Sequence, residues 1–289
     1  MASSEQALPA FMRLAGHTLR WRLLTELAAS DLRVRELMTL VGAPQNLVSY
    51  HLRLLRHGGL VTATRSSHDG RDSYYRLDLD RCAQALADAG AALHPALHPA
   101  LHPALHPALH PALHPALHPA LHPALHPALG GVPEAPAPPP RWPRLSVLFA
   151  CTGNSARSPV AEALLRRHTA GQVTVTSAGS RPAAQMNPHA VRVLRERYGI
   201  DIAGRRPRHL DTLRGRRFDY VITLCDKVRE VCPEFDDHAR WIHWSTPDPA
   251  AAGRSEQDVH AALGRVAADI DTRIRHLLPV LAQTPEAHS

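Results

Sequence analysis

Hydrophobic residues in the first ninety positions recur at helical spacing and predict three helices followed by a β-hairpin. The first predicted helix runs from His17 to Ala29. The second places apolar residues at i, i+3, i+4 and i+7, namely Val34, Leu37, Met38 and Val41. The third covers about Gln45 to His57 and ends at two glycines. Residues 60–65 and 72–77 predict the hairpin, so this order indicates a winged helix-turn-helix that is mainly α.

From residue 147 onward, apolar strand segments alternate with helical ones. The predicted strands lie at about 147–151, 173–178, 218–225 and 239–244. One predicted helix begins at Val160, two more cover 188–198 and 256–278, and a short one covers 210–213. This alternation is typical of a three-layer α/β domain, and we expect a four-stranded parallel sheet. Its carboxyl-terminal edge should gather Cys151, Cys225 and the loop after Trp244.

Between the two patterns the chain repeats Ala-Leu-His-Pro nine times, from Ala92 to Pro127. A proline at every fourth position prevents a helix or a central strand, so polyproline II or a mobile coil is expected. The histidines rotate away from one another in polyproline II, which favours a spacer over a metal site. We therefore predict a DNA-binding domain at 1–90, a linker at 91–142 and an α/β domain at 143–289.

The loop between the first α/β strand and its helix carries the clearest chemistry. It begins at Cys151 and ends at Arg157, and the residues between are Thr152, Gly153, Asn154, Ser155 and Ala156. Backbone N–H groups of such a loop can surround a tetrahedral oxyanion above a helix N-terminus, and Arg157 adds a planar fork of donors. In that positive field we expect Cys151 to have a lowered pKa and to act as a nucleophile.

Composition narrows the setting. The chain has 289 residues and a formal net charge of +7, which permits DNA or oxyanion partners. It shows no signal peptide and no apolar run near the length of a membrane span, so we expect a cytoplasmic protein without a membrane partner. In a reducing cytosol its four cysteines, Cys82, Cys151, Cys225 and Cys232, indicate redox or metalloid chemistry more than structural disulfides.

The third predicted helix presents a polar outer face suited to a major groove. We predict DNA contacts from this face and from the wing by Gln45, Asn46, Ser49, Tyr50, Arg53, Arg65 and Arg71. Residues 10–88 resemble the ArsR-type arsenical-resistance repressors, through Leu-Ala-Gly-His-Thr-Leu-Arg-Trp-Arg-Leu-Leu at 14–24 and Asn-Leu-Val-Ser-Tyr-His-Leu-Arg-Leu-Leu-Arg at 46–56. The resemblance implies a homodimer bound to operator DNA.

One departure concerns metalloid sensing. Arsenite-sensing members of the resembled family often have Cys-Val-Cys around the second helix, where this chain has Arg33-Val34-Arg35. Arginine is not a soft ligand for trivalent arsenic. Cys82 stays a weak sensor candidate that would need a second thiol, and a small core residue is the alternative.

Residues 145–280 resemble the low-molecular-weight tyrosine phosphatases and the thioredoxin-coupled arsenate reductases. The resemblance implies that Cys151 attacks the bound oxyanion, that Ser158 bonds its thiolate and that Asp248 protonates the leaving oxygen. Cys225 and Cys232, seven residues apart, match the relay thiols of the reductases. A potassium ion known in some reductases is not expected here, and Asn154 instead braces the loop.

The sequence thus predicts a bifunctional protein that reduces arsenate through Cys151, Cys225 and Cys232 and represses transcription at an operator. No bound cofactor or metal is expected, and a thioredoxin-like protein would supply electrons. A tyrosine phosphatase on a DNA-binding arm is one alternative, although no aromatic residue follows Asp248-Pro249 to wall a phosphotyrosine ring. A regulator whose second domain only senses an oxyanion is the other.

Overall fold

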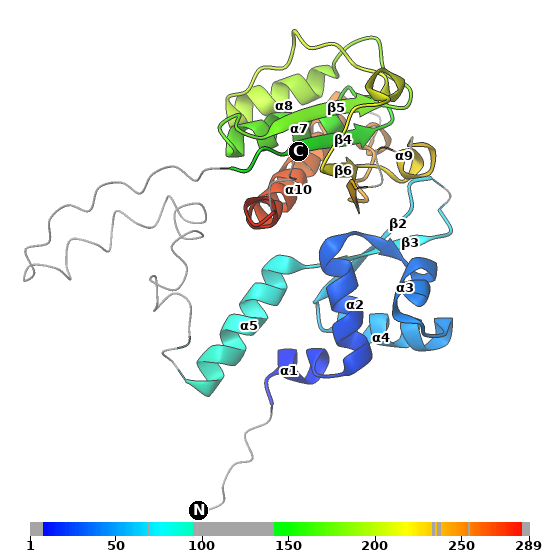
Figure 1. Ribbon diagram of the computed structural model, residues 1–289, viewed down its shortest axis with the longest axis vertical. Helices are drawn as coiled ribbons and strands as arrows, with labels where there is room; N and C mark the ends of the chain where they lie inside the picture. The colour runs from blue at the N-terminus through cyan, green and yellow to red at the C-terminus, as the bar shows by residue number, and fades with distance from the viewer. Residues whose placement is uncertain are drawn as a thin grey trace, which may run out of the picture.

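The computed structural model describes residues 8–68, 70–94, 97, 142–232, 235, 238–253 and 255–284 (Figure 1). The predictions for the Ala-Leu-His-Pro linker lie almost wholly outside the described residues. Within those ranges, no helix has both the length and the apolar character that crossing a bilayer requires.

The N-terminal part has the predicted helix-turn-helix and hairpin. Its helices are α1 (Ala10–Ala15), α2 (Thr18–Ala29), α3 (Val34–Val41), α4 (Gln45–His57) and α5 (Leu79–Leu93). Its strands are β1 (Leu32–Arg33), β2 (Val61–Arg65) and β3 (Ser73–Leu77), which form an antiparallel sheet in the order β1-β3-β2. Helix α3 ends at Gly42, whose φ of 63° is the left-handed conformation that glycine adopts without strain.

A small apolar core holds these elements together. Leu23, Leu37, Leu52 and Leu55 are completely buried in it. Because each comes from the face that the helical spacing predicts, the periodicity located this core correctly. Helices α1 and α5 pack on each other and on the same core, and the sequence pattern had not predicted either of them.

The C-terminal part contains the expected parallel sheet. Its strands are β4 (Ser146–Cys151), β5 (Thr174–Gly179), β6 (Tyr220–Thr223) and β7 (Arg240–His243), in the order β5-β4-β6-β7. The helices are α7 (Arg157–His168), α8 (Pro188–Tyr198), α9 (Asp226–Val231) and α10 (Glu256–Ala282), with 3-10 turns η4 (Leu210–Leu213) and η5 (Pro249–Ala251).

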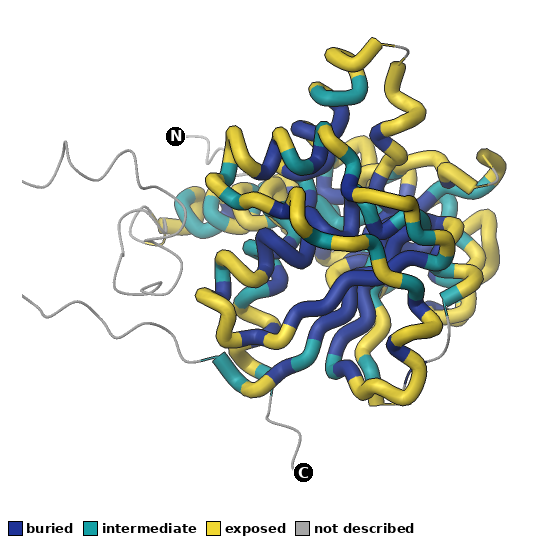
Figure 2. Tube along the Cα trace, turned by 90° about the horizontal axis from the view of Figure 1, so that it is seen from above, coloured by how far each residue is buried: buried dark blue, intermediate teal, exposed yellow. Residues whose placement is uncertain are grey.

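Strand β4 lies in the interior of this sheet, and residues 147–151 of it are buried (Figure 2). Helices α7, α8 and α10 pack on one another, while α9 packs against β4 and β6. All four strands run in the same direction, so their carboxyl ends meet at one edge. Cys151 ends β4 there, Cys225 follows β6, and the segment leading to η5 follows β7.

Candidate active site

The loop after β4 has its carbonyl groups turned away from its centre. The carbonyls of Cys151, Thr152, Gly153 and Ser155 accept hydrogen bonds of 2.9–3.2 Å from backbone N–H groups of residues 180–187. In a planar trans peptide the N–H points opposite to the C=O, so the loop's own N–H groups face inward. A loop of this geometry can surround an anion at the N-terminus of α7.

Two residues set the shape of this loop. Asn154 has a φ of 44°, and its side-chain amide donates to Ser158 Oγ and Ser177 Oγ, each at 2.9 Å. Its carbonyl oxygen accepts from the Arg208 N–H at 2.7 Å, so Asn154 braces the loop. Gly179, at the end of β5, lies so close that a Cβ would sit 2.5 Å from the carbonyl oxygen of Thr152.

The Cys151 thiol lies inside the loop, with Sγ 3.0 Å from Ser158 Oγ. Burial raises the pKa of Cys151, while the Arg157 guanidinium and the Ser158 hydrogen bond act in the opposite direction. The expected lowered pKa is therefore wrong for this structure, because the sequence shows the positive groups but not how completely the sulfur is enclosed. Arg157 and Ser158 still favour the thiolate over what burial alone would allow.

Arg157 and Asp248 meet at the mouth of the loop. The side chain of Arg157 is 8% exposed, its Nη1 donates to the carbonyl oxygen of Thr246 at 3.2 Å, and its Nη2 lies 3.8 Å from Asp248 Oδ2. Asp248 is half exposed and accepts from the N–H of Ala250 within η5. This places a carboxyl group beside the guanidinium fork, where a leaving oxygen could receive a proton.

The two further thiols flank helix α9, which is close to the loop. Cys225 is buried, and its Sγ lies 3.3 Å from Thr152 Oγ1 of the loop. Cys232 follows the last residue of α9 and is partly buried, and burial, with Cys225 nearby, raises the pKa of Cys232 to about 12. All four cysteines are free thiols. Sequence reasoning did not find α9 because six residues are too few to display a helical period.

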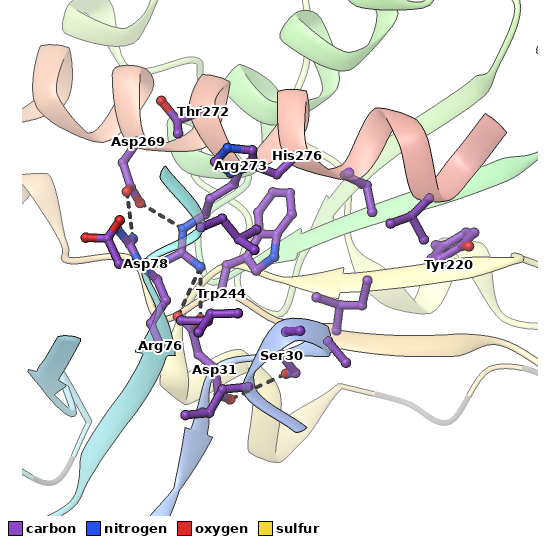
Figure 3. Close-up of a pocket in the computed structure, with 18 of the residues that line it drawn as sticks. Ser30, Asp31, Arg76, Asp78, Tyr220, Trp244, Asp269, Thr272, Arg273 and His276 are labelled. Atoms are coloured by element: carbon purple, nitrogen blue, oxygen red, sulfur yellow. Dashed lines mark hydrogen bonds and ion pairs between the residues drawn. The ribbon is translucent and has the colours of Figure 1, made fainter. Parts of the chain in front are cut away.

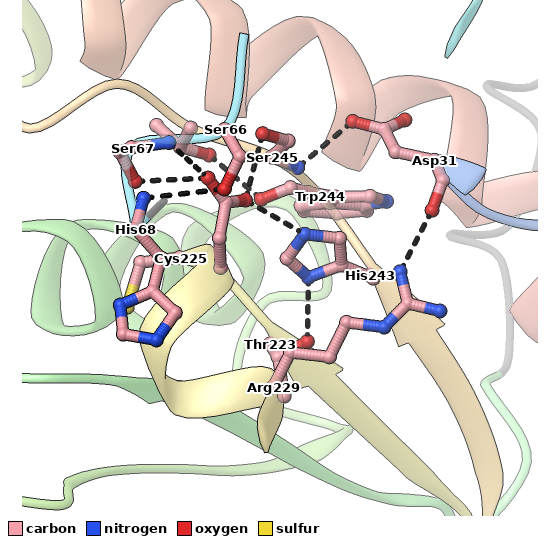
Figure 4. A network of polar contacts seen from close by, with 12 residues as sticks. Asp31, Ser66, Ser67, His68, Thr223, Cys225, Arg229, His243, Trp244 and Ser245 are labelled. Atoms are coloured by element: carbon pink, nitrogen blue, oxygen red, sulfur yellow. Dashed lines mark hydrogen bonds and ion pairs between the residues drawn. The ribbon is translucent and has the colours of Figure 1, made fainter. Parts of the chain in front are cut away.

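Asp226, the first residue of α9, lies in a buried polar network that sequence reasoning missed. Figure 4 shows this network, with Ser67, His243 and Ser245 labelled. Asp226 Oδ1 accepts from Ser245 Oγ at 2.8 Å and lies 3.1 Å from His243 Nε2, and its Oδ2 accepts from the N–H and hydroxyl of Ser67 at 2.6 and 2.9 Å. Burial alone would raise its pKa, but these bonds hold the pKa of Asp226 well below its usual range. Ser67 belongs to the wing.

The predicted DNA-contacting residues lie on α4 and the wing. Gln45, Asn46, Tyr50 and Arg53 are exposed and Ser49 is partly exposed, so the outer face of α4 is accessible. Arg65 and Arg71, on the two sides of the wing turn, are also exposed. The wing residue His68 lies with Nε2 3.2 Å from Glu230 Oε2 of α9.

The residues considered for metalloid sensing have other partners. Cys82 lies against the N-terminal core, and burial raises its pKa to about 11. Arg33 forms ion pairs with Glu36, Asp72 and Glu230, and Arg35 lies 3.5 Å from Asp72. Across the described residues, no three His, Cys, Asp or Glu side chains form a group that could hold a metal ion.

The parallel sheet and the loop after β4 give the C-terminal domain the fold of the low-molecular-weight phosphatase class. Residues 146–287 match the family described as low molecular weight phosphotyrosine protein phosphatase, and residues 18–63 match the arsR family of bacterial regulatory proteins. The chain belongs, through its C-terminal domain, to the arsenate reductases built on this phosphatase fold, and its N-terminal domain is an ArsR-family helix-turn-helix.

Relatives and solved structures carry the same name. The chain is 38% identical over 130 residues to an arsenate reductase of Bacillus licheniformis, covering 45% of this chain and 92% of that protein. It is 35% identical over 129 residues to one of Bacillus subtilis, covering 45% and 91%. Among solved structures, an arsenate reductase of Archaeoglobus fulgidus is 30% identical and covers 46% of this chain and 98% of its own, with a TM-score of 0.38. A thioredoxin-dependent arsenate reductase of Corynebacterium glutamicum is 30% identical and covers 48% and 62%, with a TM-score of 0.37.

Proposed function

We propose that this chain reduces arsenate to arsenite through Cys151, Cys225 and Cys232, and that it binds operator DNA through its N-terminal domain. The observation that carries the first part is the convergence of thiols at one sheet edge. Cys151 is inside the anion loop, Cys225 contacts the loop residue Thr152, and Cys232 is joined to Cys225 by α9. A phosphatase needs only the first of these thiols.

The first step takes place in the loop. Arsenate binds to the inward N–H groups and to the fork of Arg157, which Thr246 holds in place. The Cys151 thiolate attacks arsenic while Asp248 gives a proton to the oxygen that leaves as water. The product is a Cys151–arsenic(V) adduct.

The second step reduces the arsenic. The Cys225 thiolate attacks Cys151 Sγ, a sulfur–sulfur bond forms, and the electron pair of the sulfur–arsenic bond leaves with arsenic as arsenite. Cys232 then attacks Cys225, which frees Cys151 and leaves a Cys225–Cys232 disulfide. Two thiols have lost two electrons and arsenic has gained two. A thioredoxin-like protein restores the thiols by the same exchange chemistry.

The third thiol provides the test of this relay. In single-turnover reactions with excess enzyme, the Cys232→Ser variant should release one arsenite per active site and stop with a Cys151–Cys225 disulfide. The Cys225→Ser variant should release none. A Cys82→Ser control should match the unaltered chain. Steady arsenate reduction by the Cys225→Ser variant, measured with a thioredoxin system, would contradict the relay.

Tyrosine phosphatase activity is the second candidate, because the matching family is named for it. Ala250, Ala251 and Ala252 follow Asp248-Pro249, so this segment offers no ring to stack on a phosphotyrosine. We expect aryl-phosphate hydrolysis to be slow relative to arsenate reduction by the same preparation. If the unaltered chain does not reduce arsenate, and the Cys225→Ser variant still hydrolyses the aryl phosphate, the phosphatase function would be favoured.

The N-terminal domain is proposed to bind operator DNA as a homodimer. The exposed polar face of α4 supports the first part, and the exposed apolar side chains of Met12 on α1 and Leu86 on α5 support the second. Sequences selected from a random DNA pool by the full chain should be palindromic, and Arg53→Ala should weaken binding to them. Sedimentation should give a dimer. The remaining alternative is a C-terminal domain that only senses the oxyanion. Arsenate turnover by the full chain would exclude it.

A further inference from the structure

The N-terminal domain contacts helix α9, the segment that separates Cys225 from Cys232. The wing residue Ser67 donates twice to Asp226, and His68 lies 3.2 Å from Glu230. Arg229 donates to the carbonyl oxygen of Asp31 at 3.1 Å and to Glu36 Oε1 at 2.7 Å. Three of the six residues of α9 thus have partners in the other domain, and Figure 1 shows the β2–β3 hairpin reaching α9.

A second group of contacts ties the N-terminal domain to the strand beside α9. The N–H of Asp31 donates to the carbonyl oxygen of His243, and the His243 N–H donates to Ser30 Oγ, each at 2.9 Å. The buried ring of Tyr74 in the N-terminal sheet lies 4.7 Å from the His243 ring. His243 also contacts Asp226. The N-terminal domain therefore contacts the polar network of Figure 4 both at His243 and, through Ser67, at Asp226.

Farther along, the interface consists of ion pairs around a cavity. Asp31 pairs with Arg273 at 3.0 Å, and Arg76 pairs with Asp269 at 2.7 Å (Figure 3). A cavity of about 500 Å³ lies between these side chains and the apolar residues of both domains. An interface of paired charges that borders a cavity is held by specific polar contacts more than by continuous apolar packing. Breaking a few of these contacts would therefore release much of it.

The geometry of a disulfide is incompatible with α9 as it stands. Along a helix, seven residues advance about 10 Å. Cys225 and Cys232 are seven residues apart, at the two ends of α9. Both take part in its helical hydrogen bonds, because the Cys225 carbonyl accepts from the Arg229 N–H and the Cys232 N–H donates to the Val228 carbonyl. The Cα atoms of a disulfide lie less than about 7 Å apart, so α9 must unwind before the bond can form. Unwinding moves Asp226, Arg229 and Glu230 away from their N-terminal partners.

We infer that the N-terminal surface formed by Asp31, Glu36 and Ser67 is a docking site for helix α9 that is occupied only while Cys225 and Cys232 are thiols. The inference rests on the proposed relay for its place in turnover. Each formation of the disulfide undocks the wing from the reductase domain, and each reduction allows it to return. By linkage, docking makes the disulfide harder to form, because it stabilises the dithiol state.

The test uses the full chain with Cys82→Ser and Cys151→Ser, so that Cys225 and Cys232 form the only couple. Mixtures of oxidised and reduced dithiothreitol set its state. The dithiothreitol disulfide accepts two electrons and two protons as the protein disulfide forms. Hydrogen exchange is measured on peptides from 61–77, because they include the Ser67 N–H, which donates a hydrogen bond to Asp226. Upon oxidation we expect exchange in the wing turn to accelerate at least tenfold.

Glu36→Gln adds a second readout, since it removes the charge that faces Arg229 across the interface. It should raise the equilibrium constant for disulfide formation about tenfold, which lowers the reduction potential by about 30 mV. Glu196→Gln is the matched control, because Glu196 pairs with Arg192 on α8. Its potential should equal that of the unaltered couple.

The possible failures are distinguishable. A fully formed Cys225–Cys232 disulfide with unchanged exchange in 61–77, or equal potentials for Glu36→Gln and Glu196→Gln, would overturn the docking inference and leave the relay intact. Absence of this disulfide in every redox mixture would overturn both. A disulfide that forms in dithiothreitol and undocks the wing, but never after arsenate is added to the unaltered chain, would confirm docking and refute the relay.

Discussion

Replacing Ser158 with alanine tests how the loop stabilises its nucleophile. Ser158 Oγ accepts a hydrogen bond from Asn154 Nδ2 at 2.9 Å, and it lies 3.0 Å from Cys151 Sγ and 3.5 Å from the carbonyl oxygen of Ala178. Once Cys151 is a thiolate, its sulfur can only accept, so the Ser158 hydroxyl is then the donor of the shorter contact. The substitution removes this donor and adds no volume to the buried site. Because the donated bond is strongest when the sulfur is charged, its loss must disfavour the thiolate and raise the pKa of Cys151.

The size of the effect follows from the charge of the acceptor. A hydrogen bond to a charged group contributes about 1.5–3 kcal/mol, and one pKa unit corresponds to about 1.4 kcal/mol. The pKa of Cys151 should therefore rise further in the Ser158→Ala variant. Burial already raises this pKa, so at neutral pH both proteins are on the limb where the rate follows the thiolate fraction. The rate there should fall about 10- to 100-fold.

Alkylation by iodoacetamide measures this directly, because it requires the thiolate and involves neither Asp248 nor the other thiols. The rate is followed against pH in full chains that retain Cys151 and carry serine at the other three cysteines. Ser146→Ala, which removes a hydroxyl bonded to the carbonyl of Arg217, is the control. An alkylation midpoint that is the same with and without the Ser158 hydroxyl would refute the reasoning.

Three further changes test the anion loop and the N-terminal thiol. Arg157→Lys loses the planar fork and should raise the KM for arsenate about 10- to 100-fold, whereas an unchanged KM in steady-state assays would show that backbone N–H groups suffice. Gly179→Ala places a Cβ 2.5 Å from the carbonyl oxygen of Thr152, so the loop must shift, and kcat/KM should fall about a hundredfold in folded protein. A chain that retains only Cys82 should give no calorimetric signal with micromolar arsenite, and tight binding would restore this thiol as a sensor.

Periodicity predicted those elements whose burial is regular. Helix α4 begins after Pro44 and ends before two glycines, and its buried residues fall on one stripe, so the sequence alone located it. The parallel sheet was equally visible because β4, β5 and β6 are largely buried and its strands alternate with helices. Helix α5 was missed although it is 15 residues long, since Ala89 is its only fully buried residue and most of its face is open.

The site was predictable where chemistry is local in sequence. Cys151, Arg157 and Ser158 lie within one loop and one helical turn, so residue type and spacing suffice to place them together. Gly179 gave only the general signal of a glycine at a strand end. The pKa of Cys151 could not be predicted, because enclosure of the sulfur depends on the packing of several distant segments. Asp226 and Ser67 are 159 residues apart, and no periodic pattern relates them.

The contacts between the two domains suggest a role for the arginines at positions 33 and 35. At positions where the resembled arsenite sensors carry cysteines, Arg33 instead pairs with Glu230 of α9 and with Asp72 near the wing turn. Its guanidinium also lies 5.4 Å from the centre of the Tyr74 ring, and Arg229 of α9 lies 5.5 Å from the same ring. In the resembled arsenite sensors the N-terminal end of this helix carries the cysteines that bind arsenite. In this chain the same end of α3 contacts α9, the helix between Cys225 and Cys232. If docking follows the thiol state, the N-terminal domain responds to the reduction reaction itself, and direct binding of arsenite becomes unnecessary for that response.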